Sequence, residues 1–199
     1  MSRQTTVPDP RPLPLCRALT ASLAVLIAAA AAGTTSAQAS PATPEVPTNI
    51  AVVGDFKPYL VAHAVGWQVH HCAATATGYA WAFDGPVATL HDDRNQLIGT
   101  HSAGPTWTAR DGSSVVADVV DRAVVSPTAI PWLLLRKRSV TSGPDGDRLA
   151  DTTHIQRIAT TGGLTPAAAD CTADTVGETR SVPYTADYVF WKATGAAAA

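Results

Sequence analysis

From residue 58 onward, turn-forming residues divide the chain at regular intervals into short runs rich in β-branched and aromatic side chains. The separating sequences contain glycine, proline, asparagine and aspartate, which adopt positive φ or bond their side chains to the backbone and so reverse a strand. Regularly spaced short strands are typical of all-β sandwiches and barrels. We therefore expect an all-β, single-domain antiparallel sandwich or barrel, with strands at residues 60–64, 66–72, 79–83, 97–101, 106–110, 115–125, 132–140, 154–160 and 182–191.

Alternation within a run predicts which side chains enter the core. In the run 66–72, Trp67 and Val69 share one face of the expected strand, and we expect both to point inward. In the run 182–191, every second residue between 184 and 190 is aromatic or small, which predicts an aromatic inward face on the last strand.

The first 39 residues have the pattern of a secretory signal peptide. Three arginines precede an apolar stretch at residues 18–32, and Ala37-Gln38-Ala39 supplies a small-x-small cleavage site. A retained membrane anchor is the alternative, but a membrane-spanning helix needs roughly 20 apolar residues, more than this stretch provides. We expect cleavage after Ala39 and hence a secreted, extracellular protein with no membrane span.

Charge and composition exclude two classes of protein. The chain has a net charge of −2, and loss of residues 1–39 removes three arginines and one aspartate, so the net charge becomes −4. No basic surface for nucleic acid is therefore expected. A hydrophobic content of 46% is too high for a wholly disordered chain.

Three regions are expected after the signal peptide. Residues 40–57 contain three prolines among small and polar residues and predict a Pro-rich linker or loosely docked arm. Residues 58–192 form the all-β domain, and residues 193–199 form a flexible tail.

Cysteine usage predicts one disulfide. Cleavage removes Cys16 and leaves Cys72 and Cys171 in a compartment that oxidises thiols. Chain-entropy models assign about 4 to 5 kcal/mol to a crosslink that closes a loop of about 100 residues.

The densest group of chemically useful side chains lies in residues 99–113. It contains His101, Trp107 and Asp111, which we take as candidate ligand-binding residues. A hairpin turning at residues 102–105 would place His101 and Asp111 at opposite ends of paired strands, so no direct contact between them is expected. A purely structural explanation also fits, with Trp107 in the core and turns on either side.

Metal-assisted chemistry is a rival hypothesis. A hydrolase or oxidoreductase would need His101 to meet His91 or Asp92 from another segment. The sequence has no HxH, HExxH, GxSxG or phosphate-loop motif, and no pair of carboxylates stands out. No metal, cofactor or catalytic residue is therefore predicted, and whether the protein is an enzyme stays open.

The indole side chains suggest a ligand. An exposed indole offers a stacking surface for a glycan or another small molecule. Trp81 and Trp132, like Trp67, lie in apolar runs and are expected to be buried, whereas Trp107 and Trp191 are the candidates for exposure, although burial is favoured for each singly. A secreted binding or interaction module is the preferred function, and a structural protein of the cell envelope is a third alternative.

Several ordered motifs resemble a secreted family of bacteria and fungi that is known as a domain of unknown function. They are WxFxGPxAxL at 81–90, GxHxAGPxW at 99–107, DGS at 111–113, PWLLL at 131–135, TGG at 161–163 and YxAxYxF at 184–190. The resemblance implies export, a single domain and the pairing of Cys72 with Cys171, and it implies no activity. Residues 102–105 are also similar to copper/zinc superoxide dismutases, but the paired-histidine metal motif of those enzymes is missing.

We predict that the exported protein begins at Ser40 and carries no free thiol, because cleavage removes Cys16 and oxidation joins the other two cysteines. N-terminal mass spectrometry and thiol titration of the denatured, unreduced protein measure these two properties. Two reactive thiols per chain would contradict the disulfide, and an intact N-terminus would contradict cleavage.

Overall fold

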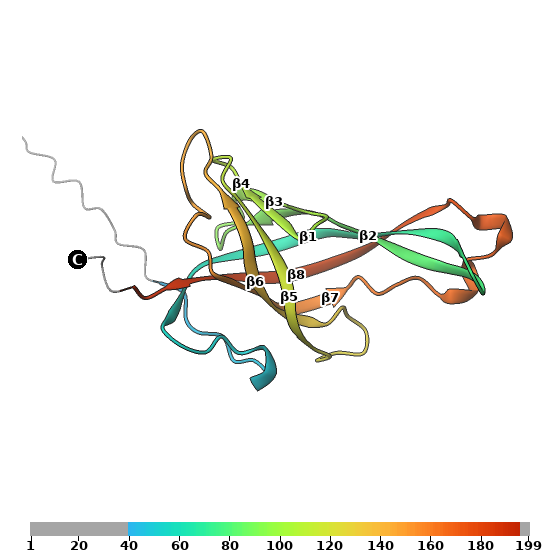
Figure 1. Cartoon of the computed structure of the whole chain (residues 1–199), viewed down its shortest axis with the longest axis horizontal. Helices are drawn as coiled ribbons and strands as arrows, with labels where there is room; N and C mark the ends of the chain where they lie inside the picture. Colours follow the sequence, from blue (N-terminus) through green and yellow to red (C-terminus); the bar gives the residue numbers. More distant parts are fainter. Residues whose placement is uncertain (1–39, 196–199) are drawn as a thin grey trace, which may run out of the picture. The chain divides into compact units, whose positions relative to one another are not determined.

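The computed structural model describes residues 40–195, which form one antiparallel β-sheet closed into a ring (Figure 1). Neighbours in the chain are neighbours in the sheet, and the last strand pairs with the first. The strands are β1 (Phe56–Thr75), β2 (Gly78–His91), β3 (Leu97–Ser102), β4 (Thr106–Ala109), β5 (Ser114–Ala123), β6 (Trp132–Thr141), β7 (His154–Gly162) and β8 (Thr179–Ala193). The all-β prediction is confirmed, and of the two expected architectures the structure is a barrel, although an uneven one.

Three short helices lie outside the strands, and residues 1–39 and 196–199 lie outside the description. Short 3-10 helices occur at η1 (Thr48–Ile50), η2 (Ala168–Asp170) and η3 (Ala173–Thr175). The predicted signal peptide, residues 1–39, lies outside the described residues. Within residues 40–195, none of the helices has the length and apolar character needed to cross a membrane.

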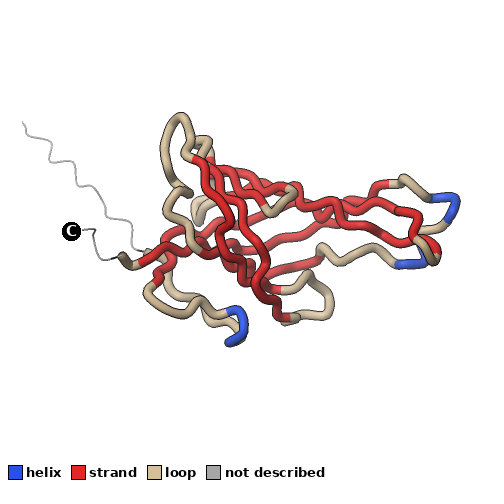
Figure 2. The backbone as a smooth tube through the Cα atoms, in the orientation of Figure 1, coloured by secondary structure: helices blue, strands red, loops and turns tan. Residues whose placement is uncertain are grey.

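The barrel is uneven because three adjacent strands are much longer than the others. β1 has 20 residues, β2 has 14 and β8 has 15, whereas β4 has four. Pairing between β1 and β2 continues to Thr75 and Gly78, and pairing between β1 and β8 continues to His71 and Thr179. The three strands therefore run on beyond the ring as an arm, defined here as residues 70–84 and 163–181, with η2 and η3 at its end (Figure 2).

A β-bulge marks the point where the arm leaves the ring. Val69 pairs with Gly85 and His70 pairs with Phe83, so Asp84 is an extra residue on β2. Gly85 has a φ of 138°, and a Cβ atom there would lie 2.6 Å from the Cβ of Ala103. Bulges bend and twist a strand locally, and this one redirects β2 out of the ring.

The core of the ring combines a few aromatic rings with many small side chains. Trp107 from β4 meets Tyr188 and Phe190 from β8 edge to face, with ring centroids 5.2 and 6.2 Å apart. Space for these rings comes from alanines, since close packing requires large and small side chains to complement one another. The buried alanines of this core are Ala62, Ala64, Ala88, Ala109, Ala117 and Ala186.

The predicted inward face of the first strands is wrong. Residues 60–64 and 66–72 belong to one continuous strand, in which Gln68 and His70 are buried while Trp67 is 49% exposed. A Cβ atom on Gly66 would lie 2.2 Å from the carbonyl oxygen of Val87, so β2 approaches β1 too closely there for a side chain. Gly66 must therefore face inward, and because side chains alternate between the two faces of a strand, the next residue, Trp67, faces outward.

The tryptophans proposed for exposure are both buried. Trp107 lies inside the ring, and Trp191 is only 3% exposed. The carbonyl of Ile50 in η1 accepts a hydrogen bond of 2.7 Å from Nε2 of Gln156, whose Oε1 accepts one of 3.0 Å from Nε1 of Trp191. Ile50 itself is fully buried. The segment before β1 thus lies against β5 and β6 and reaches β7 through the hydrogen bond from Gln156.

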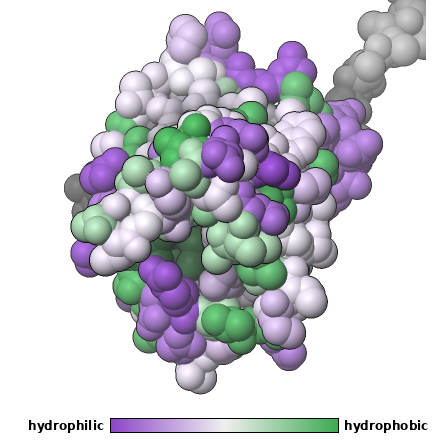
Figure 3. Space-filling view, turned by 90° about the vertical axis from the view of Figure 1, so that its right-hand side faces the viewer, coloured by the Kyte–Doolittle hydropathy of each residue, from purple (hydrophilic) through white to green (hydrophobic). Residues whose placement is uncertain are grey.

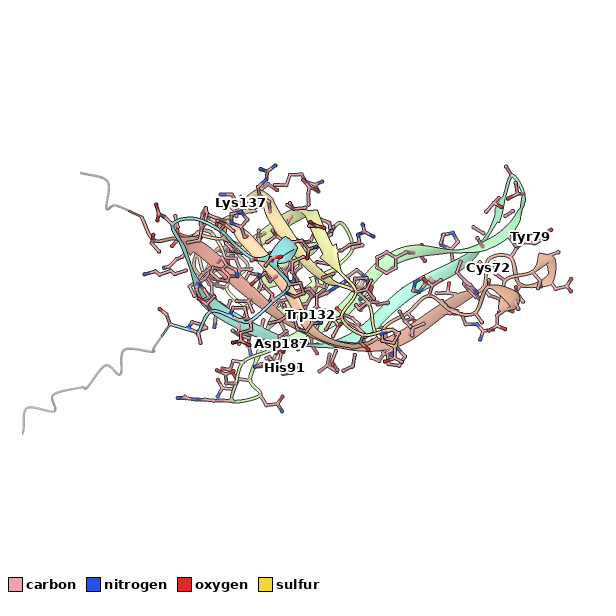
Figure 4. The ribbon with its side chains drawn as sticks, turned by 90° about the horizontal axis from the view of Figure 1, so that it is seen from below. Cys72, Tyr79, His91, Trp132, Lys137 and Asp187 are labelled. Carbon is pink, nitrogen blue, oxygen red and sulfur yellow. A yellow bond between two sulfur atoms is a disulfide. The ribbon has the colours of Figure 1, made fainter. Side chains whose placement is uncertain are left out.

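The predicted disulfide is confirmed. Cys72 and Cys171 are joined with a Cα separation of 5.3 Å, and Figure 4 places Cys72 and Tyr79 in the arm, away from Trp132 and Asp187 of the ring. Large apolar side chains of the arm, such as Tyr79 and Phe83, are exposed. A part of a protein that buries little apolar surface needs a covalent crosslink to stay ordered. The disulfide holds residues 163–178 on the arm in this way.

We predict that replacing both cysteines, C72S with C171S, loosens the arm before the ring. The crosslink is outside the core, so its loss should be felt at residues 163–178, at a cost within the range of about 2 to 5 kcal/mol usual for removed disulfides. Hydrogen exchange followed by mass spectrometry should show faster exchange there and retained protection in β3 to β6. Equal loss of protection across the ring would mean that the disulfide stabilises the whole domain.

Candidate functional site

A cavity of about 450 Å³ opens at the end of the ring from which the arm projects. This volume is within the range of roughly 300 to 1,000 Å³ typical of small-molecule sites. Seen from the side of the arm, the surface is hollowed and hydrophobic side chains lie in the hollow (Figure 3). The apolar lining is formed by Phe83, Pro86, Pro105, Val119, Leu133 and Leu135.

The structure brings two of the three candidate residues together in the wall of this cavity. His101 and Trp107 pair directly across the β3–β4 hairpin, and their rings stack with centroids 4.3 Å apart and planes 12° from parallel. Tyr188 from β8 meets the imidazole edge to face at 4.8 Å. A one-residue shift in the hairpin would turn both rings outward, so the turn at residues 103–105 sets the wall of the cavity.

Hydrogen bonding fixes the tautomer of His101. Its Nδ1 lies 2.9 Å from the carbonyl oxygen of Thr106, which can only accept, so Nδ1 carries the proton and Nε2 is an acceptor. Burial lowers the pKa of His101 to about 3, and the charge of Arg157 acts in the same direction. A group with so low a pKa is a poor general base near neutral pH. His101 therefore serves the cavity as a stacking ring and hydrogen-bond acceptor.

Asp111 lies outside the lining of the cavity. It follows β4 at the other end of the ring, where Oδ1 accepts hydrogen bonds from the backbone N–H and the hydroxyl of Ser113 at 2.9 and 2.6 Å. Oδ2 accepts from the backbone N–H of Arg148 at 2.8 Å. The Ser113 hydroxyl in turn accepts from the N–H of the buried Leu149. Asp111 thus holds the β6–β7 loop over the closed end of the ring.

The ligands of the rival metal hypothesis are not assembled around His101. His91 bonds to Thr89 and lies near the carbonyl of Asn95, while the carboxylate of Asp92 accepts from two backbone N–H groups within its own turn. Across residues 40–195, no group of three or more His, Cys, Asp or Glu side chains is placed to hold a metal ion.

Two arginines line the cavity, and the sequence analysis did not single them out. Arg157 projects from β7, and its Nε and Nη2 donate hydrogen bonds of 3.1 and 2.8 Å to the carbonyl of Pro131. Arg122 comes from the end of β5 and is exposed. In the described part of the chain, no carboxylate lies within 4 Å of either guanidinium. The sequence signal that could have found Arg157 is its spacing: it lies two residues after Ile155 and therefore shares the inward face of the strand.

The one acidic side chain in the lining is already paired. Asp84, the bulged residue at the root of the arm, lies 2.6 Å from Nδ1 of His71 through its Oδ1 atom. The imidazole engages one oxygen of this carboxylate from the arm, and the carboxylate keeps its negative charge. Two arginines against this one carboxylate leave the lining with a net positive charge.

Buried polar groups without partners occur beside the cavity. Nε2 of Gln68 and Nε1 of Trp107 have no hydrogen-bond partner among the described residues, and both residues contribute to the lining. A third such atom, Nδ1 of His70, belongs to the arm. Each unsatisfied buried donor costs about 1 to 3 kcal/mol, so a native structure that retains two at one cavity calls for an explanation.

We predict that His101 makes the domain less stable in acid. The unfolded state takes up a proton near pH 6.5, whereas the native state does not until about pH 3, so stability is full above pH 6.5 and falls as the pH drops through this window. At pH 5 the loss from this group is about 2 kcal/mol relative to pH 7.5. Urea denaturation should show H101F gaining about 2 kcal/mol relative to wild type between these pH values. Parallel pH profiles would contradict the prediction.

Comparison with known proteins identifies the family and adds no activity. No curated protein and no solved structure matches the chain. The profile of a family described as "Protein of unknown function (DUF3455)" matches residues 53–192. This range covers all eight strands except Ala193, the last residue of β8. This match confirms the resemblance inferred from the ordered motifs. The chain therefore belongs to the DUF3455 family of proteins of unknown function.

Proposed function

We propose that this protein is a secreted binding module that holds a small, largely apolar molecule in the cavity at the arm end of the ring. The observation that carries the proposal is the cavity itself: about 450 Å³, walled by apolar and aromatic side chains, with a few polar groups beside them. Concave, mostly apolar sites with a small number of polar groups are the usual form of small-molecule sites.

The lining favours a small molecule over a glycan. Sugars present many hydroxyl groups, which need donors and acceptors along the whole site, whereas Phe83, Leu133 and Leu135 offer none. The indole in the wall, Trp107, is 1% exposed and already stacked on His101, so its face is not a free platform. Trp67 is exposed, but it does not belong to the lining.

The alternatives receive less support. A purely structural envelope protein would need no open cavity with unpaired polar groups at its wall. A metal-assisted enzyme centred on His101 would need further ligands beside the imidazole, and His91 and Asp92 form their hydrogen bonds within or next to the β2–β3 turn. Export is supported by the leader pattern at residues 1–39 and by a disulfide of the kind that persists in oxidising compartments.

The proposal is tested by narrowing the mouth of the cavity. Val119 lines it and is 42% exposed, so V119W should fold while its indole obstructs entry. The matched control is V120W, because Val120 is the next residue, is 55% exposed and lies outside the lining. We expect the neutral dye N-phenyl-1-naphthylamine to gain fluorescence with the wild type and V120W, and to bind V119W at least tenfold more weakly, or about 1.4 kcal/mol.

Two results would reject the proposal. One is the absence of saturable dye binding by the wild-type protein. The other is an equal affinity of V119W and V120W, which would place the dye elsewhere on the surface. Thermal denaturation of the three proteins checks that the substitutions have not unfolded the ring.

A further inference from the structure

We infer that the ligand is an amphipathic organic anion, whose carboxylate sits at Arg157 and whose apolar body fills the rest of the cavity. The inference rests on the proposed function, since it names the class of molecule that the same cavity takes. Its basis is the set of charged and hydrogen-bonding groups around the cavity and the absence, within residues 40–195, of protein groups that satisfy them.

The lining of the cavity carries more positive than negative charge, with two arginines and one carboxylate. Arg157 and Arg122 both line it; burial lowers the pKa of Arg157, the neighbouring Tyr188 and Tyr184 oppose that shift, and the charge of Arg122 adds a smaller lowering. The charge of Arg157 likewise opposes protonation of His101. Asp84, the acid of the lining, is held by His71. An anion is the partner that would relieve this repulsion.

The guanidinium of Arg157 has hydrogen-bonding capacity to spare. Nε and Nη2 both donate to the carbonyl of Pro131, and the Tyr188 hydroxyl is also within reach of the guanidinium, which leaves part of its five N–H donors free within residues 40–195. A guanidinium is a planar fork with five N–H donors, and a carboxylate matches its spacing. Because a charged group removed from water loses hydration, a ligand carboxylate restores an interaction that the protein does not supply.

Two further donors fit the same class of ligand. The unpartnered Nε2 of Gln68 and Nε1 of Trp107 can only donate, so the missing partners must be acceptors. Both residues are more than nine-tenths buried, with exposures of 3% and 1%. A carboxylate provides two acceptor oxygens with about four lone pairs. A ligand with donor groups alone would leave these atoms unsatisfied.

The rest of the wall excludes a bare inorganic anion. Pro86, Pro105 and Val119 present apolar surface that a hydrated phosphate or sulfate would leave in contact with water. Burial of apolar ligand surface contributes roughly 25 cal/mol per Å², so a ligand with a hydrocarbon or aromatic body gains affinity from this wall. The charged groups and the apolar wall together favour a ligand that has one acidic group on a compact apolar body.

The experiment compares three probes that share one two-ring body: 1-naphthaleneacetate, 1-naphthaleneacetamide and the cationic 1-naphthylethylamine. Titration calorimetry with the purified wild-type protein at pH 7 gives the three affinities. We expect the acetate to bind at least tenfold more tightly than the amide and the amine to bind most weakly. Raised salt should reduce the advantage of the acetate, because the contribution is electrostatic.

Arginine variants then locate the acidic group. R157Q should reduce the acetate-to-amide preference to threefold or less and leave the amide affinity within threefold of wild type. Arg157 also bonds to Pro131, so R122Q provides a second variant that alters only an exposed side chain. It should weaken the acetate two- to fivefold. R110Q, which makes the same change of charge outside the lining, should retain the full preference.

The outcomes separate the inference from the proposed function. Equal affinities for acetate and amide, or a preference for the amine, would overturn the anion while the cavity remained a binding site. A preference that persists in both R157Q and R122Q would also overturn it. If none of the three probes binds and the neutral dye also fails, the proposed function and the inference fall together.

Discussion

The pairing of β8 with β1 is the constraint on which the rest of the structure depends. It closes the ring, and because both strands continue in register past the other strands, it also creates the arm. A closed ring leaves no unpaired edge within it and forces inward side chains of all eight strands toward one axis. The aromatic core, the cavity at its arm end and the disulfide in the arm all follow from this closure.

The two ends of the ring divide structural and chemical roles. At the closed end, Asp111 and Ser113 satisfy the backbone of the β6–β7 loop and seat Leu149 in the core. At the arm end, polar groups are left without protein partners, and Arg157 faces the cavity with no carboxylate beside it. Buried polar groups that satisfy one another stabilise a fold, whereas those left unsatisfied reduce its stability and mark a place where a ligand can bind.

The sequence predicted the shorter strands and the His101–Trp107 hairpin because turn chemistry and alternation are local properties, but it divided β1 in two and ended β2 at Phe83, where the strand continues to His91. The prediction failed for side chains whose inward or outward orientation is set by a partner strand. In β1 both faces carry apolar residues, so only the close approach of β2 at Gly66 settles that Gln68 faces inward and Trp67 outward. Alternation along the strand could place Arg157 on the same face as Ile155, but Arg157 becomes a wall residue of the cavity only when β5, β6 and β7 come together. The indole of Trp191 donates to Gln156 on the neighbouring strand β7, and Gln156 in turn bonds to Ile50, far away in the chain.

The order of pairing also bears on how this chain acquires its structure. Since residues 56–71 find their β8 partner only in residues 179–193, the sheet cannot be completed until residues 179–193 have been synthesised. Contacts so distant in sequence form slowly. Until then, one side of the longest strand exposes unpaired backbone groups. Closure of the ring is therefore a late event in folding, because it waits for the last strand to find the first.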